Sequence, residues 1–233
     1  MDYQNRQVVV TGGTGALGVA VVGALLAAGA ACQVPYRNED EARRFAHRSH
    51  RQVSLVALGD LADEAAVTDF YAGLDKLWAS IHLAGGFAFA PIAHSDKSLL
   101  MAQLDSNLLS SYLCSRAAVV ALRRAGTGGR IVNVAARQAL EPRLGASLTA
   151  YAVAKAGVAA LTVALAEEVA RDGILVNAIA PSIMDTPANR ASMPKADFNA
   201  WPKVDEVAAT IVFLASPQNQ VTRGAVVPAY GRV

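Results

Sequence analysis

Short apolar segments of strand length alternate along the whole chain with longer segments that are rich in Ala and Leu. The strand-like segments are Val8–Thr11, Cys32–Pro35, Val53–Leu58, Ser80–Leu83, Arg130–Val134, Leu175–Ile179 and Ala225–Pro228. The helix-like segments between them include Ala16–Ala28, Ser98–Arg124 and Ala150–Arg171. This alternation predicts parallel strands joined by right-handed crossover helices. Because the strands are unbroken apolar runs, helices are expected on both faces. We therefore predict an α/β fold with a doubly wound parallel sheet of about seven strands.

The composition describes a chain that can bury a large core within one domain. Of its 233 residues, 53% are hydrophobic and 17% are charged, which is too apolar for a disordered chain. No linker or low-complexity tract divides it, so a single domain is expected over residues 1–233. Cys32 and Cys114 lie among apolar residues and are expected to be reduced thiols. No Cys/His spacing indicates a metal site.

Charge and hydropathy restrict the partners of the chain. The net charge is +2 and no dense basic run occurs, so nucleic acid is not expected as a partner. No apolar run looks long and uninterrupted enough to span a bilayer, and the first residues do not resemble a signal peptide. We expect a small-molecule substrate, no membrane partner and a cytoplasmic location.

A glycine-rich loop follows the first strand and opens the first helix. Its residues are Gly12, Gly13, Thr14, Gly15, Ala16, Leu17 and Gly18, and the glycines at 13, 15 and 18 satisfy G-x-G-x-x-G. The glycines permit a tight turn and a close approach of the backbone to a pyrophosphate, and the helix N-terminus offers free N–H groups. In this strand–loop–helix context, we predict a Rossmann fold that binds a nicotinamide dinucleotide. The alternative is a glycine-rich turn without a ligand.

The end of the second strand bears on the choice of cofactor. An acidic residue there would hold the ribose diol of NAD, but this chain has Tyr36 and then Arg37. An arginine at this place can pair with a 2′-phosphate, so NADP(H) is favoured, with NAD(H) as the alternative. Asp60 and Leu61 follow the third strand, where Asp60 could accept a hydrogen bond from the adenine amino group.

Tyr151 and Lys155 are four residues apart in a segment without helix breakers. This spacing places both side chains on one face of a helix. The pKa of a free tyrosine is about 10, and a nearby ammonium would lower it by stabilising the phenolate. Tyr151 could then donate a proton to a carbonyl or imine that is being reduced. On its own the Tyr-x-x-x-Lys pattern is common on helices and indicates nothing.

These motifs together resemble the short-chain dehydrogenase/reductase family in order and spacing over essentially the whole chain. The matching residues are the glycine loop, Asp60, Ala84-Gly85, Asn107, Gly129–Val134, Tyr151-x-x-x-Lys155 and Val176–Pro181. The resemblance implies that Tyr151 is the catalytic acid, that Lys155 binds the nicotinamide ribose and that Asn107 holds a water. It also implies cofactor contacts at Ala84, Gly85, Gly86, Pro181, Ile183 and Thr186, and a homodimer or homotetramer formed by the long helices.

The chain departs from the family pattern at two places. Leu83-Ala84-Gly85-Gly86 stands where the family usually has Asn-Ala-Gly, and Ala135-Ala136-Arg137 holds no hydroxyl where the catalytic serine is usual. Losing one carbonyl-polarising donor costs on the order of 10²–10³ in rate. Either Ser147, Thr149 or Arg137 replaces the serine, or the substrate needs less activation.

One subgroup shares these departures. The alanine in place of the serine and the stretch Asp185–Trp201, with its Asn-Arg and Ser-Met-Pro runs, resemble dihydropteridine reductase. That resemblance implies an electron-poor conjugated substrate such as a dihydropterin. Those enzymes prefer NADH and carry an Asp after the second strand, which this chain lacks.

The segment after the sixth strand and the loop after the fourth are expected to surround the substrate. Residues 186–201 combine prolines with large apolar side chains, which indicates either a lid that closes over the substrate or a fixed capping helix. An aromatic wall of Phe87 and Phe89 would suit a flat or apolar substrate. The expected substrate contacts are Phe87, His94, Ala136, Arg137, Ser147, Met193 and Trp201.

The leading hypothesis is an NAD(P)H-dependent reductase that transfers a hydride to an activated C=O or C=N group, with a dihydropterin or another conjugated carbonyl as substrate. Because the serine is absent, a non-redox cyclase or isomerase that uses Tyr151 as an acid–base group is a second hypothesis. A cofactor-binding regulator without turnover is a third. The presence of Tyr151, Lys155 and Asn107 together speaks against the regulator, because a sensor needs no proton relay.

Overall fold

A seven-stranded parallel sheet forms the centre of the molecule. The computed structural model describes all 233 residues. The strands are β1 (Gln7–Thr11), β2 (Ala31–Tyr36), β3 (Val53–Ala57), β4 (Leu77–His82), β5 (Gly129–Val134), β6 (Ile174–Pro181) and β7 (Val226–Ala229), in the order β3-β2-β1-β4-β5-β6-β7. Every neighbouring pair is parallel. The predicted doubly wound α/β fold is therefore confirmed, with each strand within three residues of its expected position.

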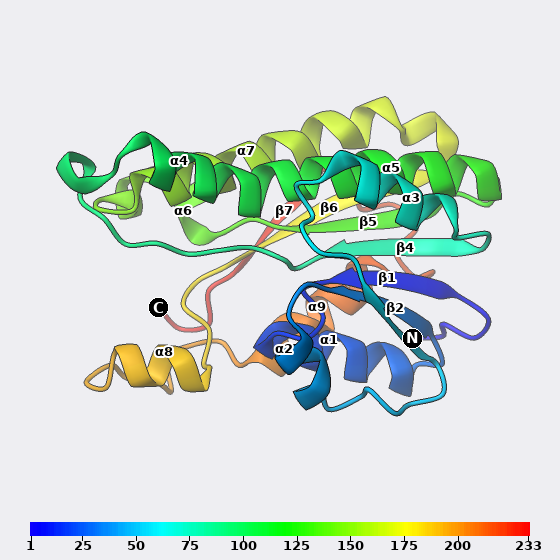
Figure 1. Cartoon of the computed structure of the whole chain (residues 1–233), viewed down its shortest axis with the longest axis horizontal. Coiled ribbons are helices and arrows are strands. Elements are labelled where there is room, and N and C mark those ends of the chain that lie inside the picture. The colour runs from blue at the N-terminus through cyan, green and yellow to red at the C-terminus, as the bar shows by residue number, and fades with distance from the viewer.

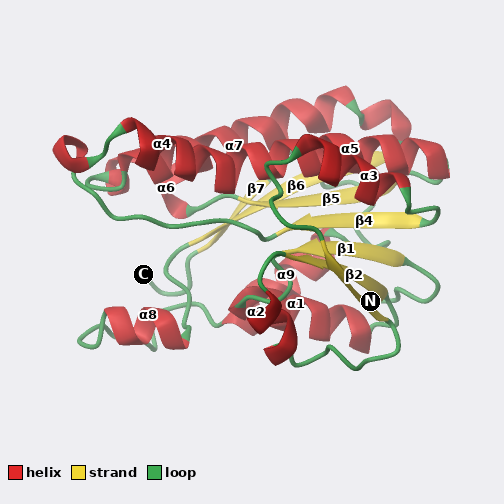
Figure 2. Ribbon diagram, in the orientation of Figure 1, coloured by secondary structure: helices red, strands yellow, loops and turns green.

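Helices cover both faces of this sheet (Figures 1 and 2). They are α1 (Ala16–Ala27), α2 (Glu39–Arg44), α3 (Glu64–Ala72), α4 (Lys97–Gln103), α5 (Ser110–Ala125), α6 (Arg137–Leu140), α7 (Thr149–Glu168), α8 (Pro187–Ser192) and α9 (Val204–Leu214). Short 3₁₀ turns lie at Ile92–His94, Pro142–Gly145 and Ala170–Asp172. Figure 1 shows α1 and α9 on one face and α3, α5 and α7 on the other, which gives three layers.

Alternating side chains of β1 divide the core between the two faces. Val8 and Val10 belong to a cluster with residues of α1 and α9, whereas Val9 belongs to a second cluster with residues of α3, α5 and α7. All three valines are fully buried. This is the two-sided burial that an unbroken apolar strand indicates, since successive side chains of a strand point to opposite faces.

The helix expected over Ser98–Arg124 contains an irregular segment. Helix α4 leads into a π-helical stretch at Leu104–Leu109 and then into α5. A π-helical turn changes the direction in which side chains leave the helix and occurs often at functional sites. Asn107 lies within this segment and is fully buried. Helical periodicity in the sequence cannot reveal such a turn.

Helix α7 corrects one expectation from the sequence. It has 20 residues, and the mean hydropathy over an 18-residue stretch of it is 1.5, so by length and composition alone it is able to cross a membrane, contrary to what we expected of every segment. The helix packs along β5 and β6, however, and carries Lys155, which is 6% exposed. Its apolar character is that of a helix that covers a sheet.

The two central strands bring the chemically important loops together. In the β1–β4 pair, Thr11 lies opposite His82, and the next residue, Leu83, donates its N–H to the Thr11 carbonyl at 3.0 Å. The chain order reverses between β1 and β4, which is where a doubly wound sheet leaves a crevice for a ligand. The glycine loop and the loop after β4 therefore face each other.

A buried hydrogen-bond chain runs through the core beneath this crevice. Tyr71 donates to Ser80 (2.7 Å), Ser80 to Nε2 of His82 (2.8 Å), Nδ1 of His82 to Asn133 (2.8 Å), and Asn133 to Thr162 of α7 (3.0 Å). This direction of donation requires a neutral imidazole with its proton on Nδ1. Burial lowers the pKa of His82 from 6.5 to about 4, in agreement with a neutral ring.

We predict that His82 makes the stability of the protein depend on pH. Because its pKa is about 4 in the folded protein and 6.5 when it is unperturbed, the unfolded chain binds more protons between these values. The free energy of unfolding should therefore fall as the pH drops through this window, by about 3 kcal/mol in total from this residue. Urea denaturation at pH 7, 6 and 5 measures the change.

Two variants identify the source of this dependence. His82→Leu should be less stable at pH 7, because it removes the imidazole partner of Ser80 and of Asn133, but its stability should change less between pH 7 and 5. His50→Gln, which removes an exposed histidine, should behave like the wild type. Equal pH dependence in all three proteins would contradict the assignment to His82.

Candidate active site

One continuous cleft lies over the ends of the central strands. Its two parts have volumes of about 330 and 340 Å³ and share lining from Gly12, Gly15, Leu83 and Gly85. The first part reaches the ends of β2 and β3, and the second reaches the first turns of α7 and the start of α8. The cleft therefore connects the glycine loop to Tyr151.

The glycine loop is packed too tightly for side chains at three positions. Gly12 has a φ of +67°, and a Cβ there would lie 2.6 Å from the backbone nitrogen of Ala84. A Cβ on Gly18 would lie 2.5 Å from the Cα of Gly13, and one on Gly13 would lie 2.7 Å from a methyl group of Val34. These glycines allow the loop to lie against β2 and the β4 loop.

The first turn of α1 is open toward the cleft. Gly15 is its N-cap residue, no side chain caps the helix, and no acidic residue lies in its first turn. Its terminal N–H groups and the positive end of its dipole are therefore free to bind an anion. Together with the tight glycine turn, this geometry fits the pyrophosphate of a dinucleotide.

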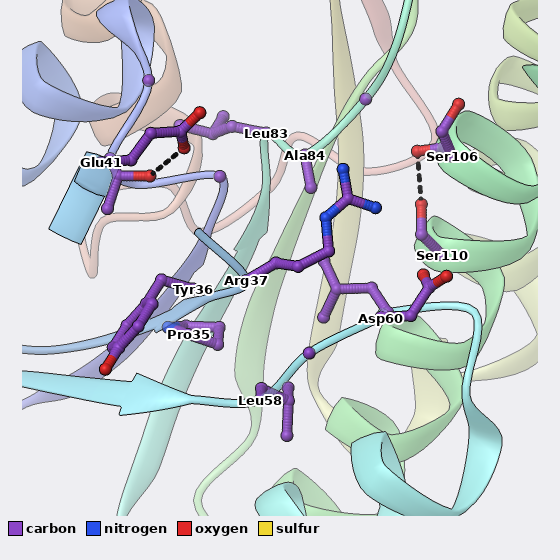
Figure 3. A pocket seen from close by; sticks show the side chains of 16 residues that line it. Pro35, Tyr36, Arg37, Glu41, Leu58, Asp60, Leu83, Ala84, Ser106 and Ser110 are labelled. Carbon is purple, nitrogen blue, oxygen red and sulfur yellow. Dashed lines mark hydrogen bonds between the residues drawn. The ribbon is translucent and has the colours of Figure 1, made fainter. Parts of the chain in front are cut away.

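Charged side chains of both signs line the far end of the cleft (Figure 3). Arg37 extends across this end toward Ala84, and it forms no ion pair with any carboxylate. Glu41 lies on the wall at the glycine loop, where its carboxylate accepts a hydrogen bond from Thr14 at 3.2 Å. Tyr36 donates to Glu39, and the carboxylate of Asp60 accepts the N–H of Ala62.

Tyr151 and Lys155 lie at the other end of the cleft. Both line it from the first turns of α7, as the four-residue spacing predicts. The ring of Tyr151 makes an edge-to-face contact with Phe87, with 5.2 Å between the ring centroids. The ammonium of Lys155 lies 5.9 Å from the Tyr151 ring centroid and donates to the carbonyl of Val134 at 2.8 Å.

Burial, and not the ammonium, dominates the acidity of this pair. Desolvation raises the pKa of Tyr151 to about 12 and lowers the pKa of Lys155 to about 8. The expectation that Lys155 lowers the pKa of Tyr151 is therefore wrong for this structure. The physical reason is that a buried phenol resists ionisation and that the ammonium is directed to the Val134 carbonyl. Tyr151 is protonated at neutral pH, as a proton donor must be.

Asn107 holds the loop after β4 in place. Its amide nitrogen donates to the carbonyls of Gly86 and Gln103, both at 3.0 Å, and its amide oxygen accepts the N–H of Gly86 at 3.2 Å. A Cβ on Gly85 would lie 2.7 Å from this amide oxygen and 3.5 Å from the Lys155 ammonium. The amide thus fixes the backbone that separates the glycine loop from Lys155.

No hydroxyl stands beside Tyr151 at the end of β5. Ala136 lines the cleft there and is almost fully buried. Ser147 has a φ of +61°, and its carbonyl accepts the N–H of Ala90, so it supports the loop that carries Phe89. Thr149 is the first residue of α7 and is exposed. Neither hydroxyl lines the cleft, so neither Ser147 nor Thr149 replaces the serine in this structure.

Most residues that the sequence selected do meet in this cleft. It is lined by Gly12, Thr14, Gly15, Ala16, Leu17, Gly18, Tyr36, Arg37, Asp60, Leu61, Ala84, Gly85, Gly86, Phe87, Asn107, Ala136, Tyr151, Lys155, Pro181 and Thr186. Seven expected residues are not among its lining: Gly13, His94, Arg137, Ser147, Ile183, Met193 and Trp201.

These absences have local causes. Gly13 is covered by Val34, and Trp201 is buried against Phe198, so neither can touch a ligand in this cleft. His94 ends an exposed 3₁₀ turn, and Ile183 is directed to solvent. Met193 is the C-cap residue of α8, beyond the cleft.

Several residues that line the cleft were not predicted from the sequence. They are Pro35, Glu41, Leu58, Gly59, Leu83, Ser106, Ser110, Val134, Ala135, Ser182, Met184 and Asn189. Most of them adjoin a recognised motif, so extending each motif by two residues would have found them. Glu41 and Asn189 are different, because each reaches the cleft from a short helix whose direction only the fold defines.

Comparisons with known proteins agree with this geometry. The short chain dehydrogenase family matches residues 6–197. The galactitol 2-dehydrogenase of Rhizobium johnstonii is 32% identical, over 97% of this chain and 96% of that enzyme. A subunit of the (2S)-[(R)-hydroxy(phenyl)methyl]succinyl-CoA dehydrogenase of Thauera aromatica is 30% identical, over 99% and 97%.

A solved structure supports the same fold. ElxO with NADP bound is similar with a TM-score of 0.87 and 23% identity, and the match covers 97% of both chains. At this identity the likeness concerns the fold alone.

The glycine loop yields a test with a matched control. We predict that Gly18→Ala lowers the free energy of unfolding by about 2 kcal/mol or more, because its Cβ would meet backbone atoms that cannot move aside. Gly15→Ala should cost less than about 1 kcal/mol, since its Cβ would lie 3.4 Å from its nearest neighbour. Thermal denaturation compares the two, and equal losses would contradict this description of the loop.

Proposed function

The chain belongs to the short-chain dehydrogenase family, whose members are NAD(P)-dependent oxidoreductases, and on that premise we propose that it is a reductase with Tyr151 as proton donor. It transfers a hydride to an activated C=O or C=N group of a small molecule. The observation that carries this proposal is the placement of Tyr151 and Lys155 in the same cleft as the open N-terminus of α1.

The residues of the chain fit the parts of such a reaction. A nicotinamide cofactor, held by the glycine loop and the open N-terminus of α1, would supply the hydride for the carbonyl or imine carbon. Tyr151 donates its phenolic proton to the oxygen or nitrogen as negative charge develops there. Burial keeps this proton in place at neutral pH, since it raises the pKa of Tyr151 to about 12. Lys155 lies on the same face of α7 and donates to the Val134 carbonyl, and Asn107 fixes the loop at Gly86 against which the reactants lie.

NADP(H) is the preferred cofactor in this proposal, with NAD(H) as the alternative. Arg37 carries a positive charge into the end of the cleft where an adenosine ribose would lie, and it forms no ion pair with a carboxylate. Tyr36 stands in place of the acid that would accept from a ribose diol. The carboxylate of Glu41 in the same region opposes a 2′-phosphate, but its hydrogen bond to Thr14 holds it toward the glycine loop.

The absent hydroxyl at Ala136 supports an activated substrate, because such a group accepts hydride with less polarisation. A dihydropterin is one candidate, and it rests on the resemblance of residues 185–201 to dihydropteridine reductase. The same observation favours one second function, a non-redox cyclase or isomerase that uses Tyr151 as an acid–base group. Product formation without a change in reduced-cofactor absorbance would identify that function.

We further propose a cytoplasmic homodimer or homotetramer, with residues 186–201 as a lid over the substrate. Large apolar side chains remain exposed on the outer faces of α5 and α7, among them Tyr112, Val120, Val153 and Val163. A second copy of the chain would cover them.

We predict that Tyr151→Phe lowers kcat by a factor on the order of 10²–10⁴, because it removes the general acid. Cofactor affinity should change little, because the ring and its contact with Phe87 remain. The consumption of reduced cofactor measures kcat, and titration calorimetry measures the affinity for the cofactor. Tyr112→Phe, at an exposed tyrosine on α5, is the control and should keep full activity. Full activity of Tyr151→Phe would remove the catalytic assignment.

We predict that Arg37→Ala weakens NADPH binding by about tenfold or more, since a charge-assisted hydrogen bond contributes about 1.5–3 kcal/mol. NADH binding should change by less than about threefold. Glu41→Gln should leave NADPH binding equal or tighter, because it removes a carboxylate near the phosphate. Dissociation constants from fluorescence titration give both comparisons. Equal losses of NADPH and NADH in Arg37→Ala would show that no 2′-phosphate contact exists.

A further inference from the structure

Arg137, Glu141 and Tyr230 form a cluster beside the reaction end of the cleft. Nε of Arg137 donates to both carboxylate oxygens of Glu141, each at 3.2 Å. The guanidinium stacks on the ring of Tyr230, with 4.6 Å from Cζ to the ring centroid. The cluster joins the start of α6 to the C-terminal segment that follows β7.

Two direct links place this cluster at the rim of the cleft. Arg137 follows Ala136, which lines the cleft next to Tyr151. The hydroxyl of Ser182, another lining residue, donates to the Tyr230 carbonyl at 2.8 Å. Arg137 and Tyr230 thus each adjoin a residue that lines the cleft, while the guanidinium itself lies just outside the lining.

The Arg137 side chain is held in one orientation, but not all of its N–H groups have a hydrogen-bond acceptor in the protein. Its side chain is only 25% exposed, and one carboxylate and one aromatic ring fix its plane. Nη1 and Nη2 carry four of the five N–H donors of the guanidinium, and neither nitrogen has a protein acceptor. A pair of parallel N–H groups in a fixed plane matches the two oxygens of a carboxylate.

Lys155 is the only cationic side chain among the residues that line the reaction end of the cleft. Lys155 is buried and its ammonium donates to the Val134 carbonyl. The opposite wall is apolar, since Phe87 is 64% exposed and touches Tyr151 edge-on, and Phe89 follows it with similar exposure. A ligand at this end therefore meets an aromatic surface beside the proton donor and a cationic fork at the rim.

We propose that the substrate is a ring compound with a carboxylate, whose ring lies against Phe87 and whose carboxylate binds the Nη groups of Arg137. This inference rests on the proposed reductase function and specifies its substrate class. Glu141 is then a positioning residue, which aims the guanidinium through Nε. The competing view is that Arg137 and Glu141 only fasten the C-terminal segment to α6.

The test compares 4-acetylbenzoate with its methyl ester, which share the ring and the ketone but differ in charge. Binding is measured by titration calorimetry on the wild-type protein saturated with NADP⁺, so that no turnover is needed. The acid should bind at least about tenfold more tightly than the ester, as a charge-assisted bidentate contact implies. Equal affinities for acid and ester would overturn the proposal.

Two variants break the same ion pair and separate the two views. Arg137→Gln should reduce the acid-to-ester preference to about one while changing ester binding by less than about threefold. Glu141→Gln keeps the guanidinium and an amide oxygen that can accept from Nε, and it removes a competing carboxylate, so the preference for the acid should persist or grow. The proposal fails if both variants lose the preference for the acid to the same degree, or if both lose ester binding equally. In either case the cluster only holds the C-terminal segment against α6.

Turnover with NADPH separates this proposal from the reductase function. Reduction of the ester at the rate of the acid would leave the reductase intact and remove the carboxylate contact. An Arg137-dependent preference in binding, without any consumption of NADPH, would keep the carboxylate site and remove the reductase.

Discussion

The contact between the glycine loop and the loop after β4 is the constraint on which the site depends. Parallel pairing of β1 with β4 brings Leu83 within hydrogen-bonding distance of Thr11, and the absence of a side chain at Gly12 lets the backbone reach Ala84. The same approach directs the first turn of α1 into the cleft without a capping side chain. Asn107 then holds the following residues, so that the β4 loop forms one wall of the space before Tyr151. A bulkier residue at this contact would displace both loops together.

Burial governs the charges of the site and of the core beneath it. It raises the pKa of the Tyr151 phenol and lowers those of Lys155 and His82, and each shift favours the neutral form of the group. For Tyr151 the consequence is a phenol that stays protonated at neutral pH, as the proposed general acid must be. For His82 it is a directional hydrogen-bond chain from Tyr71 to Thr162, which ties β4 and β5 to the helix that carries Tyr151. Catalytic geometry and core stability thus share one physical cause.

The two arginines at opposite ends of the cleft give the proposed reaction its selectivity. Arg37 lines the cleft where the adenosine part of the cofactor would lie, and Arg137 stacks on Tyr230 just outside the lining of the other end. Each has N–H groups that no protein carboxylate occupies, although Arg137 is anchored through Nε. Between them the cleft is lined by glycine backbone, apolar side chains and polar side chains such as Asn107, and Lys155 is the one cation there.

The sequence by itself determined the sheet, the glycine loop and the helical turn that joins Tyr151 to Lys155, because these depend on local periodicity and on backbone freedom at particular glycines. It also showed that Ala136 stands where a hydroxyl is usual and that Tyr36 stands where an acid would hold a ribose diol. Only the tertiary structure decided that Asn107 lies in a π-helical turn and grips Gly86, that Glu41 reaches the cleft, and that Trp201 does not. It also decided the acidity of Tyr151, where desolvation outweighs the lysine. Such features depend on how segments that are distant in the sequence pack together and on how much water they exclude. Residue spacing along the chain encodes neither.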